Sequence, residues 1–397
     1  MKLGVFFFGA VRMPDAGDCG PRPVDRCYGP EAIAQAYDDL AHWAVTADDL
    51  GYVSLWLTEH HFQNEGYEVM PNCVLVGAVL AQRTRQLKFG AMFNFVPQWH
   101  PLKLREDFAI RDIMSGGRLL FGVGQGTVVR KALNFGTNIG SIDWDSVGQP
   151  EASVVADAVN RAQFEEGMEV IRRAFSGEPF SYHGNYCHFP PLGMPDRSRF
   201  ASEITLAPSP VHLPVEIWQP VTSDGTMRYV AEHGINAVCW NHGYAGMRDR
   251  WERFGAIAEA AGRDLGRGGG RMLIATVHLG PSRAAALESA RHGHEEFTRF
   301  LLPYARKAGE KGASGYSGRA ATLEDALEAR SWFVGTPAEV AADLADIRSE
   351  LGYEYLMTMV HWPGTTVPQV GDQLTHFRHE VLPLLELAGV AGSAIGV

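Results

Sequence analysis

Long apolar runs and an excess of positive charge are both missing from this 397-residue sequence. A membrane-spanning helix needs roughly 18 or more apolar residues in succession, and no run in the sequence approaches that length. The 35 lysines and arginines are outnumbered by 46 aspartates and glutamates, which gives a formal net charge of −11. Because binding of a polyanion requires a clustered basic surface, we expect neither a membrane span nor a nucleic-acid partner.

Cysteine is scarce, and its spacing matches no common metal or disulfide pattern. The five cysteines are odd in number and far apart, and none forms a C-x-x-C pair. The opening segment MKLGVFFFGAVRMP has one charge before a short apolar run and no clear small-x-small cleavage pattern after it, so it predicts a buried strand rather than a secretory signal. Reduced, scattered cysteines favour a cytoplasmic protein.

Short β-rich runs alternate with amphipathic helical patterns along the chain. This alternation is typical of a parallel sheet covered by helices. Eight runs are predicted to be strands, at residues 3–8, 53–59, 87–96, 119–124, 215–221, 236–240, 272–279 and 355–361. Eight is the strand number of a TIM-type (β/α)8 barrel. We therefore expect residues 1–397 to form a single α/β barrel domain, with long insertions in the loops at the carboxyl ends of the strands.

Helix start and stop signals lie between these runs. Residues 31–51 place alanines at helical spacing and end at Gly51, a common stop residue. Farther along, Thr336 is predicted to cap a helix with Glu339 as its capping-box partner, and Gly352 to end it. These are the helices that a barrel needs between its strands.

Two segments interrupt the alternation. Residues 180–213 are rich in proline, glycine and aromatics and lack a helical period, which predicts a long excursion with one hairpin. Residues 307–322 are small, polar and glycine-rich, which predicts a mobile loop over the mouth of the barrel.

One predicted strand finishes in an acid and two adjacent histidines, Glu59, His60 and His61. Side chains alternate along a strand, so at most one of the two histidines faces the barrel mouth. An imidazole there can move a proton near neutral pH or hydrogen-bond an anionic cofactor. A structural role for both histidines is the alternative.

A metal-dependent barrel hydrolase is a further alternative for the same histidines. The adjacent pair lacks the His-x-His spacing that would put two ligands on one face of a strand. Other histidines near predicted strand ends are His100, His242 and His361. We expect no metal site, but the number of histidines available as ligands keeps the hydrolase hypothesis open.

Two turns have the composition of ligand-binding loops. In FGVGQGTVV (residues 121–129) the third glycine of a G-x-G-x-x-G fingerprint would fall on Thr127, so the dinucleotide pattern is incomplete. Its glycines instead let backbone approach a flat ligand or form a tight turn. SDGTMRYVAEHG (residues 223–234) opens a predicted helix with Ser223 and Thr226, which makes either an anion site or an ordinary N-cap.

Four motifs in this order resemble the bacterial luciferase-like flavin-dependent monooxygenases, and the match extends over nearly the whole chain. They are LWLTEHHF, FGAMFNFVPQWHPLKLREDFAIRDIMSGGRLLFGVGQG (residues 89–126), FEEGMEVIRRAF (residues 164–175) and FVGTPAEVAADLADIRSELGYEYLMTMV (residues 333–360). The resemblance implies a TIM-type barrel. It also implies an enzyme that takes reduced flavin mononucleotide (FMN) from a separate reductase, forms a flavin hydroperoxide with O2 and oxidises an organic substrate.

The resemblance also implies roles for individual residues. His60 matches the catalytic histidine of the family, which acts as a base and supports the flavin peroxide, and His61 matches the second histidine of that motif. Ser223 and Thr226 match the phosphate site of the family, which favours the anion interpretation over simple capping. Further matched positions are His100, Pro101, Glu106 and Asp107, the acidic pair being structural.

Two more parts of the flavin site follow from the resemblance. The family has a non-prolyl cis peptide in the third strand beside the flavin ring, which falls near Met92 and Phe93 here. After the fourth strand, luciferase has a cysteine and a phosphate-binding arginine where this chain has Gly124 and Gln125. A glutamine hydrogen-bonds but cannot neutralise charge, so Arg130 is a candidate replacement, and we expect no luminescence.

Other functions on the same barrel stay open at this point. A deazaflavin-dependent oxidoreductase would use His60 in hydride transfer without O2, and a non-catalytic flavin-binding homologue is a further reading. The aromatic strands suggest a small, mostly apolar organic substrate, whose choice residues 180–213 would set. We expect a homodimer that receives reduced flavin by diffusion from its reductase.

Overall fold

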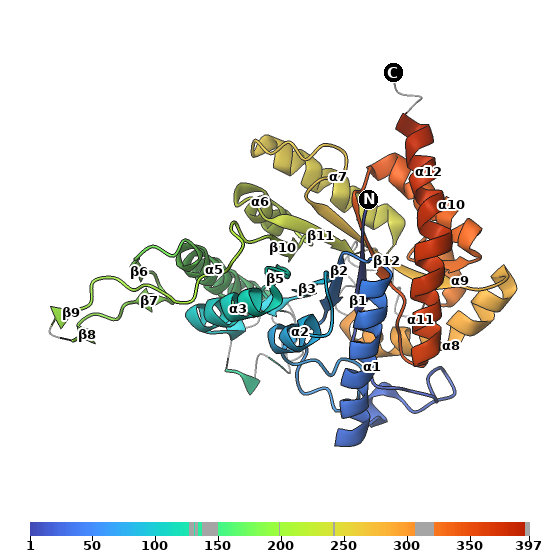
Figure 1. The fold of residues 1–397 in the computed structure, drawn as a ribbon, viewed down its shortest axis with the longest axis horizontal. Helices are drawn as coiled ribbons and strands as arrows, with labels where there is room; N and C mark the ends of the chain where they lie inside the picture. Colours follow the sequence, from blue (N-terminus) through green and yellow to red (C-terminus); the bar gives the residue numbers. More distant parts are fainter. Residues whose placement is uncertain are drawn as a thin grey trace.

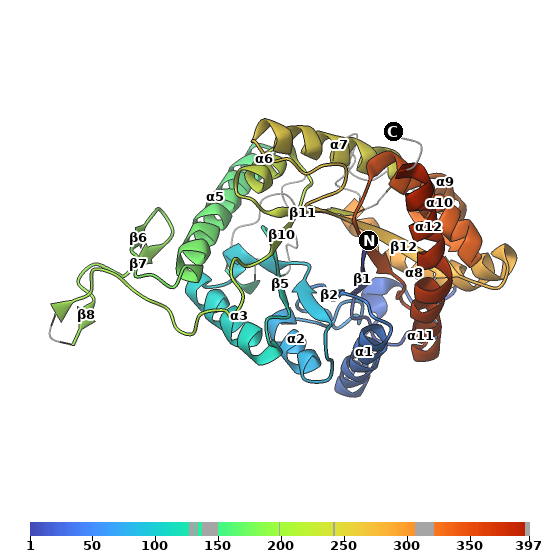
Figure 2. The ribbon, with the colours of Figure 1, turned by 45° about the horizontal axis from the view of Figure 1, so that its top comes forward.

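The computed structural model describes residues 1–126, 131, 134–136, 150–197, 199–240, 243–305 and 321–393. Figures 1 and 2 show the strands in the centre, the helices around them, and a narrow arm that extends to one side. Most of the predicted mobile loop, together with Thr127, Arg130 and His242, lies outside the described residues.

Eight parallel strands close into a barrel, and each of the eight predicted runs overlaps one of them. In ring order they are β1 (Lys2–Phe7), β2 (Ser54–Leu57), β3 (Lys88–Ala91), β5 (Leu119–Gly124), β10 (Ile217–Pro220), β11 (Asn236–Trp240), β12 (Arg271–Leu279) and β14 (Tyr355–Met359). The ring is completed where β5 pairs with β10, with Ile217 beside Phe121. The prediction of a TIM-type barrel is confirmed.

Two short strands add to this ring. β4 (Asn94–Phe95) continues the third predicted run and pairs with the end of β5. β13 (Trp332–Gly335) pairs with the second half of β12, from Thr276 to Leu279. The sequence analysis did not predict β13, because its four residues run directly into the N-cap of the next helix and are too few to stand out as a periodic segment.

The helices surround the barrel (Figure 2). They are α1 (Pro30–Asp49), α2 (Cys73–Ala81), α3 (Pro101–Ser115), α5 (Pro150–Phe175), α6 (Asp224–Glu232), α7 (Tyr244–Ala260), α8 (Arg283–Ala305), α9 (Leu323–Glu328), α10 (Pro337–Leu351), α11 (Val367–His376) and α12 (Leu382–Ser393), with short turns η1 (Pro23–Asp25) and η2 (Val96–Gln98) and the π-helical turn η4 (Phe377–Val381). Across the described ranges, none of these helices combines the length and the apolar character needed to cross a membrane.

The predicted helix ends of α10 are confirmed. The Thr336 hydroxyl accepts a hydrogen bond from the backbone N–H of Glu339, and the Glu339 carboxylate accepts one from the backbone N–H of Thr336 at 2.8 Å. Gly352 ends the helix with a φ of +69°, a conformation that costs glycine little. Gly51 likewise follows α1 with a φ of +75°.

Alternation along the strands divides the apolar core into two layers. On β1, Val5 and Phe7 pack outward with the helices, whereas Phe6 and the following Phe8 pack inside the barrel with Trp56. Parallel strands covered on both sides read as nearly continuous apolar runs, which is why these segments were recognisable in the sequence.

The arm consists of residues from the predicted excursion at 180–213. It has two short hairpins, β6–β7 (Tyr182–His183 with His188–Phe189) and β8–β9 (Pro195–Asp196 with Arg199–Phe200), where one was predicted. The Glu166 carboxylate accepts hydrogen bonds from the backbone N–H groups of Asn185 and Tyr186, both at 2.9 Å. This contact ties the root of the arm to α5.

Candidate functional site

A cavity of about 530 Å³ lies at the carboxyl ends of the barrel strands, where this fold places active sites. Its volume is within the range of small-molecule and cofactor sites. The wall residues are Phe8, Thr58, His60, Glu68, Met92, Phe93, Phe95, Gly124, Gln125, Gly126, Asp157, Arg161, Gln219, Pro220, Thr222, Ser223, Thr226, Trp240, Phe300 and Leu301. Seven of the eight predicted site residues are therefore together in one wall, and the eighth, His61, is absent from it among the described residues.

His60 lies against a second acid that the sequence analysis did not identify. Its Nε2 atom is 3.0 Å from Oε1 of Glu68, whose side chain is almost fully buried. Burial lowers the pKa of His60 to about 3, with a further contribution from the charge of Lys131. Burial also raises the pKa of Glu68 well above its usual range. Both pKa shifts favour the uncharged form of the side chain.

Glu59 and His61 lie on the other side of the strand end. The buried Glu59 carboxylate forms an ion pair with the ammonium group of Lys131 and accepts hydrogen bonds from Trp99 Nε1 at 3.3 Å. His61 Nε2 is 3.5 Å from Glu59 Oε1, and the His61 ring packs edge-on against Phe135. The two histidines therefore face different surroundings, but strand alternation is not the reason, because β2 ends at Leu57, before both of them.

The strands β3 and β5 approach each other closely beside Met92 and Phe93. The Met92–Phe93 peptide bond is cis, at the position that the family resemblance implied. A Cβ atom on Gly122 would lie 1.8 Å from the carbonyl oxygen of Ala91, and one on Gly124 would lie 3.2 Å from Phe93 Cβ. Glycine is required at position 122 by this contact, and at position 124 it leaves backbone open to the cavity.

The first turn of α6 forms the polar part of the wall. Ser223 is the N-cap residue, and its hydroxyl accepts a hydrogen bond from Thr226 N at 3.3 Å, so the capping interpretation is confirmed. The guanidinium group of Arg161, from α5, reaches the same turn, since a Cβ atom on Gly225 would lie 2.8 Å from Arg161 Nη1. The unpaired N–H groups and partial positive charge of a helix start favour an anion, and here they are joined by a cation and two hydroxyls.

Arg161 was not predicted from the sequence. The family resemblance implied a phosphate-binding cation near Gln125, at the end of the fourth barrel strand. Gln125 does lie in the wall, and its carbonyl oxygen accepts a hydrogen bond from Asn160 Nδ2 at 3.2 Å. Asn160, which holds the backbone of Gln125, is the residue directly before Arg161 on α5. Only the folded barrel brings α5 to the start of α6.

Other residues named in the sequence analysis lie outside the cavity wall. His100 precedes α3 and packs against Phe189 of the arm, with ring centroids 5.4 Å apart. His361 is buried against Trp43. Asp107 forms an ion pair with Lys103 on α3. Within the ranges that the structure describes, no group of three or more His, Cys, Asp or Glu side chains is arranged to hold a metal ion.

Several known proteins with similar sequences are monooxygenases. An uncharacterised protein, y4wF of Sinorhizobium fredii, is 28% identical over 335 residues, covering 83% of this chain and 86% of that protein. The oxygenase component of a flavin-dependent trigonelline monooxygenase from Acinetobacter baylyi is 25% identical over 214 residues, 54% of this chain and 51% of its own. An F420-dependent glucose-6-phosphate dehydrogenase from Amycolatopsis mediterranei is 23% identical over 365 residues, covering 88% of this chain and 95% of that protein.

The fold also matches solved structures of flavin enzymes. The oxygenating constituent of 3,6-diketocamphane monooxygenase from Pseudomonas putida, in complex with FMN, superposes with a TM-score of 0.73 at 21% identity, covering 97% of this chain and 98% of that one. The sequence profile described as luciferase-like monooxygenase matches residues 1–355. The chain is an enzyme of the luciferase-like monooxygenase family.

Proposed function

We propose that this enzyme is the oxygenase of a two-component system. It binds reduced FMN supplied by a separate reductase and uses O2 to oxidise a small, mostly apolar organic molecule. The observation that carries the proposal is a cavity with apolar and aromatic walls, in which Arg161 of α5 also reaches the first turn of α6. A flat ring system bearing a phosphate group matches both parts of that wall.

Individual residues fit the two ends of FMN. Arg161, Ser223 and Thr226 would hold the phosphate, because an arginine fork and a helix N-terminus both favour phosphate oxygens. Gln219 is buried in the same wall, and its Oε1 atom has no hydrogen-bond partner within the described structure. This oxygen is an acceptor for an N–H group on the edge of the ring system.

Bound reduced FMN supplies the electrons with which one atom of O2 enters the substrate and the other becomes water. The chain's own residues provide the surroundings for that chemistry. Phe8, Met92, Phe93 and Trp240 exclude water. His60 presents an uncharged imidazole that hydrogen-bonds and moves a proton. His61 lies outside this wall, where its ring contacts Glu59.

A deazaflavin-dependent oxidoreductase is the second candidate. It is favoured by the relative that is named as F420-dependent and aligns over 88% of this chain. In that case the cavity would hold a deazaflavin, His60 would assist hydride transfer, and no O2 would be consumed.

Anaerobic titration of the purified protein with reduced FMN, and separately with reduced F420, distinguishes the two candidates. Bound reduced FMN should then consume O2, and ¹⁸O₂ should label the product formed from a panel of apolar ketones and aldehydes. Saturable binding of F420 alone would reject the monooxygenase proposal in favour of the second candidate. Binding of neither would reject both.

We also propose that residues 1–397 act as one domain in a cytoplasmic homodimer that meets its reductase only transiently. Adjacent exposed apolar side chains often mark a protein interface. The outer faces of α2 and α3 carry such side chains, namely Leu75, Val79, Ile110, Ile113 and Met114. Light scattering should give a dimer mass that falls to a monomer mass in an Ile113→Glu variant, and a monomeric wild type would contradict the proposal.

A further inference from the structure

Residues 66–69, in the connection between β2 and α2, lie close to both His60 and α8. Backbone hydrogen bonds hold the segment in place, from Val11 N to the Gly66 carbonyl at 2.8 Å and from Val69 N to the Gly9 carbonyl at 3.1 Å. The two side chains between them have different partners. Tyr67 contacts α8 through its hydroxyl group, and Glu68 contacts His60.

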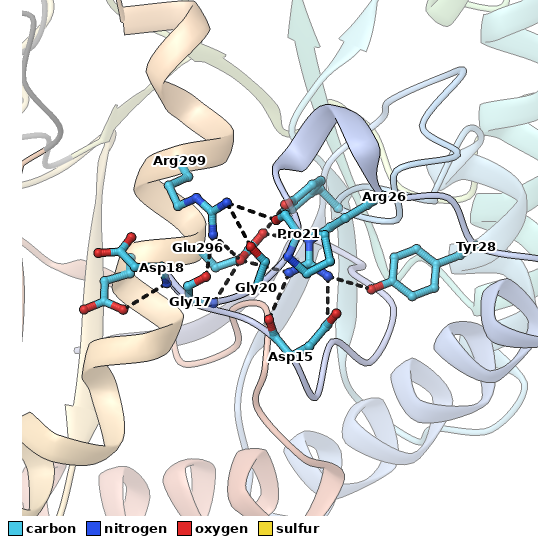
Figure 3. Close-up of polar contacts among 11 residues, drawn as sticks. Asp15, Gly17, Asp18, Gly20, Pro21, Arg26, Tyr28, Glu296 and Arg299 are labelled. Atoms are coloured by element: carbon cyan, nitrogen blue, oxygen red, sulfur yellow. Dashed lines mark hydrogen bonds and ion pairs between the residues drawn. The ribbon is translucent and has the colours of Figure 1, made fainter.

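A buried ionic cluster surrounds Glu296 of α8, with Arg26 and Arg299 on either side (Figure 3). Tyr67 joins this cluster through its hydroxyl group. The Glu296 carboxylate is fully buried and accepts hydrogen bonds from Arg26 Nε at 2.9 Å and from Gly17 N at 2.9 Å, as well as from the Tyr67 hydroxyl. The Tyr67 ring stacks on Phe300, with centroids 4.2 Å apart and planes 10° from parallel. A side chain held at both its ring and its hydroxyl restricts the backbone of the next residue, so Glu68 has little freedom to leave His60.

The surroundings of Glu68 favour a protonated carboxyl group. Its side chain is 4% exposed, and its second oxygen is 3.5 Å from the amide nitrogen of Gln63, a neutral donor. Within the part of the chain that the structure describes, the buried cation nearby is Lys131, and it is paired with Glu59 instead. A carboxyl group buried without a cation keeps its proton, because ionisation there costs more than it gains.

We propose that Glu68 is the positioning residue of His60, whose protonated carboxyl donates to Nε2 and thereby fixes the ring hydrogen on Nδ1. The pair then holds two hydrogens, one on the Glu68 oxygen and one on Nδ1. The catalytic consequence rests on the proposed function, since a fixed donor nitrogen matters where His60 meets a cofactor or substrate oxygen.

Nitrogen NMR of ¹⁵N-histidine-labelled protein tests this assignment, with His60 identified by the signals that vanish in a His60→Gln variant. The wild type should show an unprotonated Nε2 and a protonated Nδ1. Glu68→Gln should keep this tautomer, because an amide N–H also donates to Nε2, whereas Glu68→Leu should lose it. A protonated Nε2 in the wild type, or an unchanged tautomer in Glu68→Leu, would overturn the proposal.

A matched control comes from the same loop. Glu65 is half-buried and does not belong to the described cavity wall, so Glu65→Gln should leave the His60 signals unchanged. Thermal unfolding of each variant shows whether it is folded, and the wild-type tautomer decides the question even where Glu68→Leu does not fold. The spectra need no flavin, so a failure of the flavin titration refutes the proposed function and leaves the Glu68 result standing.

Discussion

Replacing Arg161 with glutamine should weaken the binding of reduced FMN and leave the binding of reduced riboflavin nearly unchanged. The two ligands share the ring system and differ in the phosphate, and Arg161 lies where a phosphate would meet the first turn of α6. A hydrogen bond to a charged group contributes about 1.5–3 kcal/mol. At about 1.4 kcal/mol per factor of ten, the loss in FMN affinity should be roughly 10- to 150-fold.

Anaerobic fluorescence titrations of the variant and the wild type with each ligand measure this difference. Arg291→Gln is the matched control, because Arg291 pairs with Glu324 on the surface of α8 at 2.6 Å, outside the cavity wall. The control should bind both ligands as the wild type does. An equal loss for FMN and riboflavin would show that Arg161 supports the cavity in general, and an unchanged FMN affinity would remove it from the phosphate site.

Three further predictions concern single sites. Thr226→Val should weaken FMN binding by about 1 kcal/mol by removing a hydroxyl, and an unchanged affinity in the same titration would leave Thr226 only its place in the capped turn. Arg26→Met should lower the free energy of unfolding, measured by urea denaturation, by about 3–5 kcal/mol, because Glu296 stays buried without its main cation. The double variant Arg26→Met, Glu296→Leu should recover most of that loss. Burial lowers the pKa of His361 to about 4, so between pH 6.5 and 4 only the unfolded chain takes up a proton at this residue. The free energy of unfolding should therefore fall as the pH drops through that range. In His361→Phe, the fall should be smaller by up to about 1.4 kcal/mol per pH unit.

The barrel could be predicted because each strand carries its own local signal. A strand buried on both faces is apolar at nearly every position, and the run from Tyr355 to Met359 is recognisable without knowing its neighbours. The helix caps at Ser223 and Thr336 are local in the same sense, since each is set by residues within three positions.

The partners within the site were not predictable in this way. Lys131 pairs with Glu59 across 72 positions of sequence, and Arg161 reaches a helix that begins more than 60 positions later. Nothing near any of these residues signals the contact, because it depends on how the barrel closes and on the direction in which each side chain leaves its element. Even Glu68, only eight positions from His60, was missed, because an irregular loop has no period from which to infer its direction.

Glu59 and His60 are therefore neighbours in the sequence but have different side-chain partners in the structure. Glu59 is neutralised by Lys131 and faces away from the cavity, so it is not the acid that acts on His60. The acid beside His60 is Glu68, which is buried with no cation against it among the described residues and is held by a neighbour that α8 anchors. A carboxylate paired with a lysine lies just after β2, while a carboxyl group whose pKa is raised by burial contacts the imidazole. Exchanging these two environments, and not the two residue types, would change the chemistry of the site, because both residues are glutamate and only their surroundings differ.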